Sequence, residues 1–269
     1  MRETLHWTID LILILATVTF AALCADLRRR VLEETGKGAA HPIPTVKLKA
    51  FDPAFSTDDL GPTPASEVSF IGKGDGVPGG ASDPETWILS TLSKSALHLF
   101  EFGTCTGKTA YLWARNSAPE ARVFTLTLDP ETTPTYRAEP GDSRIARTKA
   151  IEESRFQRLR YTGSDVEGKI TQLYGDSKAF DETPHLGRCD LIFVDGSHAY
   201  SYVKSDSEKA LRMLSEGGTI LWHDYRGRRG STRGVYDYLN ELSRTLPLVH
   251  LRGTSLVAYV SGRGEEAAG

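Results

Sequence analysis

Short, continuously apolar segments alternate with helix-compatible segments through most of this 269-residue chain, and this alternation constrains the fold more than any other feature. Unbroken apolar runs are typical of strands that are buried on both faces of a sheet. Strands of this kind, separated by helices, form a parallel sheet with helices on both sides. We therefore expect an α/β fold with a doubly wound, mostly parallel sheet.

Seven segments have the character of strands, and the last two are expected to close the sheet as an antiparallel pair. The predicted strands cover residues 96–102, 122–128, 170–174, 191–194, 219–222, 246–251 and 255–260. The predicted helices cover residues 84–93, 108–116, 202–214 and 232–245. The first helix follows Ser82-Asp83-Pro84-Glu85, a pattern of capping residue, proline and acid that is typical of helix starts. Gly217-Gly218 is interpreted as the stop before the fifth strand.

The N-terminal segment differs from the rest of the chain. Residues 11–25 carry no charge, and residues 5–25 are interrupted only by His6 and Asp10. A helix needs about 20 mostly apolar residues to span a membrane, so residues 5–25 are a candidate membrane anchor. Three arginines follow at 28–30, which by the positive-inside rule predicts a cytoplasmic catalytic domain. A cleaved signal peptide and a buried N-terminal helix are the alternatives.

These patterns divide the chain into four parts. Residues 1–30 form the hydrophobic N-terminal helix, and residues 31–81, rich in turn residues, form a linker and lead-in segment. Residues 82–262 form the main domain, and residues 263–269 form a flexible tail.

Charge and cysteine content exclude two kinds of protein. The net charge of −3 argues against a nucleic-acid-binding protein that relies on attraction to phosphate. Cys24, Cys105 and Cys189 are widely spaced and include no CxxC pair, so they predict neither a disulfide framework nor a zinc knuckle.

The turn after the first strand permits two interpretations. Residues 103–109, GTCTGKT, resemble a phosphate-binding P-loop containing Lys108, and residues 191–195, LIFVD, resemble the acidic strand that accompanies it. A P-loop needs four residues between its first glycine and the Gly-Lys pair, but here there are three. Glu101 at the strand end would also repel phosphates. A P-loop-like nucleotide-binding protein is therefore the disfavoured alternative.

Glu101, Gly103 and Gly107 form the pattern ExGxxxG, which resembles the first motif of class I S-adenosylmethionine (SAM)-dependent methyltransferases. SAM has no phosphate, but it has a sulfonium and an amino group that suit a carboxylate. Glycines allow the backbone to approach the ligand closely. We assign Glu101, Gly103, Thr104 and Gly107 to cofactor binding, in a Rossmann-like domain.

Acidic residues also follow the next strands, at the sheet edge where ligands of such folds bind. Asp129 ends the second strand, 22 residues after Gly107, and can accept both ribose hydroxyls. Asp176 and Ser177 follow the third strand. In the family that the first motif resembles, residues at this position contact adenine, so both join the expected cofactor site together with Asp195.

The segments FVDGSHAY and GGTILWHDY, separated by a helix, are the most specific signal in the sequence. They resemble small-molecule O-methyltransferases of the type that acts on macrolide sugars, and more distantly the catechol and caffeoyl type. The resemblance covers about Ser82 to Ser261. In the macrolide-sugar type, the histidine that matches His198 is the proposed general base, and an imidazole can accept a hydroxyl proton near neutral pH.

Asp195 and Asp224 end adjacent strands, so their carboxylates can share one cation, and oxygen ligands suit Mg²⁺. Metal-dependent relatives add a ligand where this chain has Tyr225, a poor ligand for magnesium. Either another acid completes the site or no metal binds. His223 is interpreted either as a ligand or as a structural histidine.

We therefore expect a SAM-dependent methyltransferase that methylates an oxygen of a hydroxylated small molecule or sugar, with His198 as base and Mg²⁺ as a candidate cofactor. The expected partners are a small-molecule acceptor and a second copy of the chain in a homo-oligomer, without nucleic acid. A catalytically silent SAM-binding module associated with a membrane is the other alternative.

Overall fold

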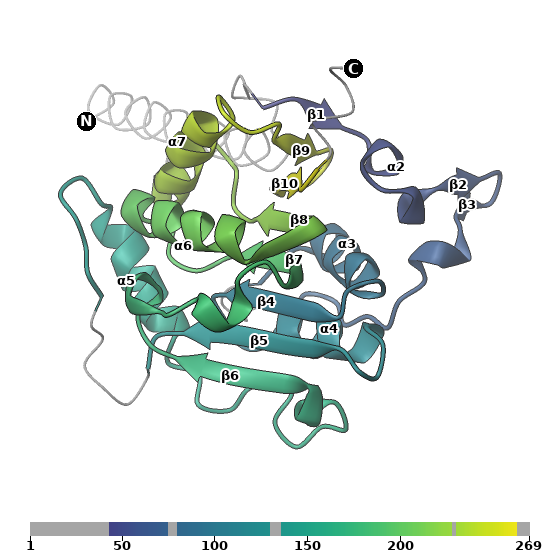
Figure 1. Ribbon diagram of the computed structural model, residues 1–269, viewed down its shortest axis with the longest axis horizontal. Helices are drawn as coiled ribbons and strands as arrows, with labels where there is room; N and C mark the ends of the chain where they lie inside the picture. The colour runs from purple at the N-terminus through teal and green to yellow at the C-terminus, as the bar shows by residue number, and fades with distance from the viewer. Residues whose placement is uncertain (1–42, 75–79, 130–135, 228–229, 263–269) are drawn as a thin grey trace, which may run out of the picture. The chain divides into compact units, whose positions relative to one another are not determined.

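A computed structural model describes residues 43–74, 80–129, 136–227 and 230–262 (Figure 1). The hydrophobic segment 5–25 and the tail 263–269 lie outside these residues, and the predictions made for them stay predictions. Within the described ranges, no helix has both the length and the apolar character needed to cross a membrane.

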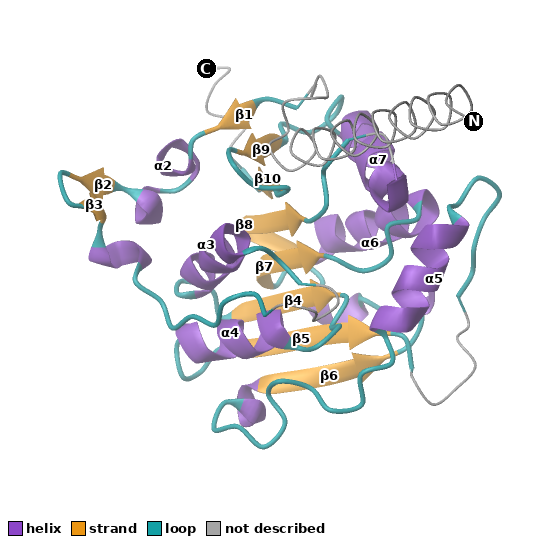
Figure 2. Ribbon diagram, turned by 180° about the vertical axis from the view of Figure 1, so that it is seen from behind, coloured by secondary structure: helices purple, strands orange, loops and turns teal. Residues whose placement is uncertain are grey.

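The described residues form an eight-stranded sheet in the order β1-β9-β10-β8-β7-β4-β5-β6 (Figure 2). The five strands β6, β5, β4, β7 and β8 run parallel, and β10 is antiparallel to both of its neighbours. In chain order the parallel strands lie as 3-2-1-4-5, which is the doubly wound arrangement of a Rossmann-like fold. The strands are β1 (Thr45–Val46), β4 (His98–Phe102), β5 (Arg122–Thr127), β6 (Ile170–Tyr174), β7 (Cys189–Val194), β8 (Leu214–Trp222), β9 (Val249–Leu251) and β10 (Val257–Val260).

The predicted α/β fold is confirmed, as is the antiparallel end of the sheet, but the predicted count of seven strands is wrong. The eighth is β1 in the lead-in segment, which pairs with β9 through Thr45 and His250. A strand of two residues is too short to produce an alternating pattern in the sequence. The lead-in also contains α2 (Leu48–Phe51) and a small hairpin of β2 (Thr57–Asp58) and β3 (Gly61–Pro62).

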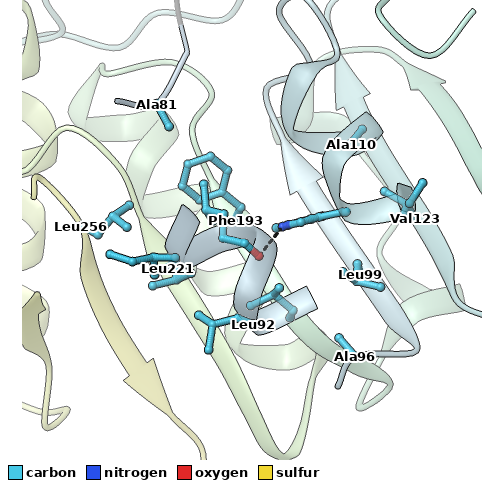
Figure 3. Packing of buried hydrophobic residues seen from close by; sticks show 14 of the residues in the cluster. Ala81, Leu92, Ala96, Leu99, Ala110, Val123, Phe193, Leu221 and Leu256 are labelled. Carbon is cyan, nitrogen blue, oxygen red and sulfur yellow. Dashed lines mark hydrogen bonds between the residues drawn. The ribbon is translucent and has the colours of Figure 1, made fainter. Parts of the chain in front are cut away.

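Among the described residues, five longer helices pack around the sheet, and apolar side chains bury both of its faces. One core cluster joins α3 and α4 to one face of the sheet, where Leu99, Val123, Phe193 and Leu221 of four strands lie side by side (Figure 3). A second cluster joins α6 and α7 to the opposite face. The helices are α3 (Asp83–Ser93), α4 (Lys108–Asn116), α5 (Arg144–Glu153), α6 (Tyr200–Met213) and α7 (Arg233–Leu242). Single 3₁₀ turns are η1 (Pro53–Phe55), η2 (Pro64–Ser66), η3 (Glu167–Lys169), η4 (Ser177–Ala179), η5 (Thr183–His185) and η6 (Gly230–Thr232).

Strand β8 differs most from its predicted range. It begins at Leu214, directly after α6, and the Gly217-Gly218 pair lies inside it rather than before it. The pairing with β7 shifts register between Cys189 and Leu191. A Cβ atom at residue 218 would lie 2.8 Å from the Cys189 carbonyl oxygen, so glycine there permits the close approach of the two strands. The glycines therefore mark an irregularity within the strand.

Candidate active site

The carboxyl ends of the parallel strands meet at one edge of the sheet, where a pocket of about 520 Å³ lies. Its walls come from the ends of β4, β5, β6 and β7 and from α5 and α6. The lining residues include Gly103, Leu128, Gly175, Ser177 and Asp195, each of which follows a strand.

The loop after β4 approaches the end of β7 so closely that only glycine fits. Gly103 has a φ of +102°, and a Cβ atom there would lie 2.2 Å from the carbonyl oxygen of Asp195. Gly107 caps α4 with a φ of +74°, and a Cβ atom there would lie 2.8 Å from the ring of Tyr161. The two glycines let the loop pack against its protein neighbours, and Gly103 also lines the pocket.

Glu101 and Thr104 lie beneath this loop in a buried polar network. The Thr125 hydroxyl donates to Glu101 over 2.6 Å and lies 2.8 Å from the Thr104 hydroxyl, which accepts from Gln172 Nε2. Burial raises the pKa of Glu101 to about 8, and the nearby carboxylate of Asp195 adds to the effect. Neither Glu101 nor Thr104 is among the residues that line the pocket, so in this structure they support the loop from below.

The P-loop interpretation places Lys108 on a phosphate, but the structure places it elsewhere. Lys108 lines a small cavity between α3 and α4, and its ammonium group donates to the hydroxyl of Thr86 over 3.4 Å. Burial lowers its pKa. This lysine does not line the pocket at the strand ends.

A second hollow, of about 580 Å³, adjoins the first and shares Cys105, Glu153 and Asp195 with it. It contains the side chains that follow β7 and β8, together with lysines and an arginine from surrounding segments. Its lining residues include His198, His223, Asp224, Arg226, Lys73 and Lys149.

His198 is held by a carboxylate on the neighbouring strand end. Its Nε2 lies 2.8 Å from Oδ2 of Asp224, and both side chains are buried. Although burial opposes it, the positive charge of His223 and the hydrogen bond from His198 hold the pKa of Asp224 well below its usual range. An ionised carboxylate only accepts hydrogen bonds, so Nε2 of His198 carries the proton. The other ring nitrogen, Nδ1, is buried without a hydrogen-bond partner among the described residues.

His223 lies among three carboxylates. Its Nδ1 is 2.9 Å from Asp195 and 3.7 Å from Asp224, and its Nε2 is 3.2 Å from Glu85. Burial opposes a positive charge here, but the carboxylates of Asp195 and Asp224 outweigh it and raise the pKa of His223 well above its ordinary value. His223 is therefore an imidazolium that donates from both nitrogens. Of the two predicted roles, a structural one fits this arrangement.

Residues 100–225, just under half of the chain, match the model of a family described as a methyltransferase domain. This part of the chain is therefore similar to methyltransferase domains. Together with the strand order, the match supports a SAM-dependent methyltransferase enzyme. No curated protein sequence matches the chain.

Solved structures resemble this chain at low sequence identity. One is the O-methyltransferase TomG from Streptomyces achromogenes in complex with SAM, with 19% identity, 68% of this chain and 82% of that chain covered, and a TM-score of 0.45. Another is the SAH-bound methyltransferase PaMTH1 from Podospora anserina, with 17% identity, 68% and 79% covered, and a TM-score of 0.47.

The acids predicted to contact the nucleoside lie around the first pocket, at the strand ends. Asp129 is half-buried and follows Leu128, which lines the pocket. Asp176 is buried between the lining residues Gly175 and Ser177, where its carboxylate caps η4 by accepting from the Lys178 backbone over 3.0 Å. The pocket wall at these two positions is formed by their neighbours rather than by the acids themselves.

Sequence reasoning missed several residues of the same pocket. Asp206 in α6 lines it with only 1% of its surface exposed, and burial raises the pKa of its carboxyl to about 7. Tyr136 and Tyr202, which also line it, stack with their ring centroids 4.3 Å apart. Asp206 lies in the middle of a predicted helix, where no strand end draws attention to it. The sequence pattern around Glu85 indicates only a helix start, whereas in the structure Glu85 reaches His223.

The predicted magnesium site can be tested by the ligand atoms that the structure brings together. Ligand atoms of Asp195, His198 and Asp224 lie within 4.8 Å of one another, close enough to surround a cation after small movements. However, Asp224 already accepts from His198 and from Arg226, at 3.0 Å, and Asp195 accepts from His223. A magnesium ion would have to displace these donors, so the residues do not fit it as arranged. The cation between the two carboxylates is the imidazolium of His223.

Proposed function

We propose that the protein transfers the methyl group of SAM to a hydroxyl oxygen of a small molecule or sugar, with His198 accepting the hydroxyl proton. The observation that carries the proposal is the contact between two hollows. The pocket at the strand ends suits the cofactor, and the adjoining hollow around His198 suits the acceptor. Both are bounded by Asp195 and Glu153. Reaction partners bound on either side would meet at this shared wall.

The tautomer of His198 supports its role as a base. Because its Nε2–H group donates to Asp224, the lone pair of the neutral ring lies on Nδ1. The acceptor oxygen attacks the methyl carbon, the bond from that carbon to sulfur breaks with its electrons going to sulfur, and the hydroxyl proton passes to Nδ1. The carboxylate of Asp224 keeps the ring in this orientation and stabilises the imidazolium that forms, which is the part a carboxylate plays beside catalytic histidines.

The cofactor pocket supplies recognition rather than chemistry in this scheme. The stacked tyrosines Tyr136 and Tyr202 offer an aromatic wall for a purine, and the buried carboxyl of Asp206 offers a partner for its exocyclic amine. The backbone at Gly103 allows the nucleoside to lie against the strand ends.

Ligand-induced stabilisation and labelled methyl transfer test the proposal together. SAM at about 100 times its Kd should stabilise the protein by about 2.7 kcal/mol, which corresponds to a Tm increase of roughly 5–10 °C, whereas ATP should leave the Tm unchanged. Labelled SAM should methylate members of a panel of hydroxylated acceptors. SAM binding without transfer to any acceptor would instead favour the silent module.

The proposal includes a homo-oligomer, which light scattering after size-exclusion chromatography would test.

A further inference from the structure

Three metal-ligating side chains gather at the opposite edge of the sheet, away from the proposed site. His98 begins β4, Cys189 begins β7 and His185 ends η5. Because β4 and β7 are parallel, their first residues lie at the amino edge, while the candidate active site lies at the carboxyl edge. One nitrogen of each imidazole and the sulfur of Cys189 all lie within 4.8 Å of one another. The proposed methyl transfer uses none of these residues.

Cys189, at the start of β7, packs on a different face of the sheet from the one that strand alternation predicts. Side chains alternate between the faces of a strand, so Cys189 should share a face with Leu191. Leu191 packs in the cluster beneath α3 and α4, but Cys189 packs with Ile192 in the cluster beneath α6 and α7. The pairing of β7 with β8 shifts register at the same place, between Cys189 and Leu191. This packing places Cys189 on the face on which Phe100 and His185 lie.

The two histidines are held in place by aromatic neighbours. The ring of His98 stacks on Phe124 with centroids 4.8 Å apart, and His185 contacts Phe124 and Phe100 edge-on at 4.7 and 5.1 Å. Nε2 of His98 lies 3.0 Å from Nδ1 of His185. A hydrogen bond between two imidazoles requires an unprotonated nitrogen as the acceptor, so at least one of the two rings is neutral. A histidine that binds a metal must also be neutral. Rings restrained in this way lose little freedom when they bind an ion.

We propose that His98, His185 and Cys189 form a zinc site at the amino edge of the sheet. Two imidazole nitrogens and a thiolate are a ligand set that suits zinc. Bond lengths of about 2.0–2.1 Å to nitrogen and 2.3 Å to sulfur place tetrahedral ligand atoms roughly 3.4–3.6 Å apart. The two nitrogens, at 3.0 Å, need to separate by only a few tenths of an ångström to admit the ion.

The surroundings of the proposed zinc site can accommodate loss of the Cys189 proton and a fourth ligand. When zinc binds, Cys189 forms the bond to the metal through its thiolate and releases its proton to solvent, and no oxidant is needed. A water molecule takes the fourth position, which it can reach because His98 is only partly buried. Asp190 does not supply the fourth ligand, since its Oδ2 accepts from the backbone of Leu97 and His98. The ion would tie β4, β7 and the η5 segment together.

Cobalt(II) titration of the full chain tests this site. A cobalt ion bound to Cys189 should give a thiolate-to-cobalt charge-transfer band at one equivalent, and zinc should abolish the band by replacing cobalt. Binding at Asp195, His198 and Asp224 would give no such band, because that cluster contains no sulfur. Cys105 lines the hollow that holds this second cluster, so the band distinguishes the two clusters only if it persists in Cys105→Ser. Absence of the band from the wild-type protein would overturn the proposal.

Variants assign the band to particular residues. Cys189→Ser should abolish it, and His98→Gln should weaken binding by about 10–100-fold, the range that loss of a supporting contact already costs at metal sites. The matched control is Cys105→Ser, which removes the other cysteine of the described residues and should keep the band. If Cys189→Ser fails to fold, His98→Gln decides, because His98 is only partly buried. A band that persists in His98→Gln with unchanged affinity, or disappears in Cys105→Ser, would contradict the assignment.

Discussion

Nδ1 of His223 lies 2.9 Å from Oδ1 of Asp195, so the side chain that follows β8 is tied to the one that follows β7. The other ring nitrogen reaches Glu85 in α3, a residue 138 positions earlier in the chain. Glu85 in turn accepts from the backbone and hydroxyl of Ser255, each over 2.7 Å. One buried imidazolium therefore joins a helix, two strand ends and the segment before β10. We expect this network to hold the acceptor hollow in shape.

Replacing His223 should strongly destabilise the fold. Removing one member of a buried ion pair leaves an uncompensated charge and costs about 3–5 kcal/mol, and we expect His223→Gln to lose this amount near pH 6. The raised pKa of His223 means that its contribution is complete below 6.5, its ordinary value, and is lost as the pH rises through the folded value. Urea unfolding of both proteins, at pH values up to roughly two units on either side of neutrality, measures the difference in their free energies of unfolding.

The partner of this interaction can be identified by a double-mutant cycle with Glu85→Gln. If His223 and Glu85 stabilise each other, the double variant should lose less stability than the sum of the two single losses, by roughly 0.5–3 kcal/mol. Additive losses, or a His223→Gln effect that does not change between acid and alkaline pH, would show that the ring acts by packing rather than by charge.

Replacing the buried glutamates Glu85 and Glu101 by glutamine should change the stability of the protein in different ways. Although burial opposes it, the hydrogen bond and charge of His223 lower the pKa of Glu85, so its contribution is present above 4.5 and lost as the pH falls. Burial raises the pKa of Glu101 to about 8, so the folded protein keeps a proton that the unfolded chain releases above 4.5. As the pH rises from 4.5 to about 8, Glu101 therefore lowers the stability of the wild-type protein. The contribution of Glu85 to stability is fully present at neutral pH.

The matched variants Glu85→Gln and Glu101→Gln measure this contrast. At neutral pH, Glu85→Gln should destabilise the protein, while Glu101→Gln should cost little, because its amide oxygen can still accept from Thr125. Relative to the wild type, Glu101→Gln should gain stability as the pH rises toward 8. Equal losses for both variants across this pH range would contradict the assigned charge states. Thermal unfolding in a series of buffers is sufficient for the comparison.

Local sequence patterns predict the fold, whereas the contacts of the candidate site depend on tertiary packing. Continuous apolar runs such as residues 191–194 define buried strands locally, and the parallel order follows from their alternation with helices. The short strand β1 gave no such signal. The strand-end rule located Asp195 and Asp224, but it also selected Glu101, whose side chain lies beneath the loop because alternation along β4 turns it toward Thr125.

Contacts between distant segments could not be inferred from local patterns. The approach of Glu85 to His223 depends on how α3 packs against the end of β8. Asp206 faces the cofactor pocket from the middle of α6, where an isolated acid in a helix usually indicates a solvated face. Only the tertiary structure distinguishes such buried acids from exposed ones.

Gly103→Ala should weaken cofactor binding and also destabilise the fold. The Cβ atom would lie 2.2 Å from the Asp195 carbonyl oxygen, and the positive φ adds backbone strain of about 1–3 kcal/mol. The collision moves the ends of β4 and β7 apart where they form the pocket. We expect a loss of at least tenfold in SAM affinity, which corresponds to about 1.4 kcal/mol, measured by isothermal titration calorimetry.

Gly141→Ala is the matched control, because Gly141 has nearly the same φ, +99°, but a Cβ atom there meets nothing within 4 Å. This variant should show the backbone strain alone, with normal SAM affinity. If both variants bind SAM equally, the contact of Gly103 with Asp195 does not shape the pocket.

His198→Gln tests the proposed base directly. Loss of a general base lowers kcat by about 10²–10⁴-fold, whereas the Kd for SAM should stay within about twofold of the wild-type value, less than 0.5 kcal/mol, because His198 lies in the acceptor hollow rather than in the cofactor pocket. Glutamine retains a donor for Asp224, so the fold should be kept. The loss should also be smaller for acceptors with more acidic hydroxyl groups, since these release their proton with less assistance. A uniform loss across acceptors of different acidity, or an equal loss of SAM affinity, would mean that His198 positions neighbouring groups and takes no proton.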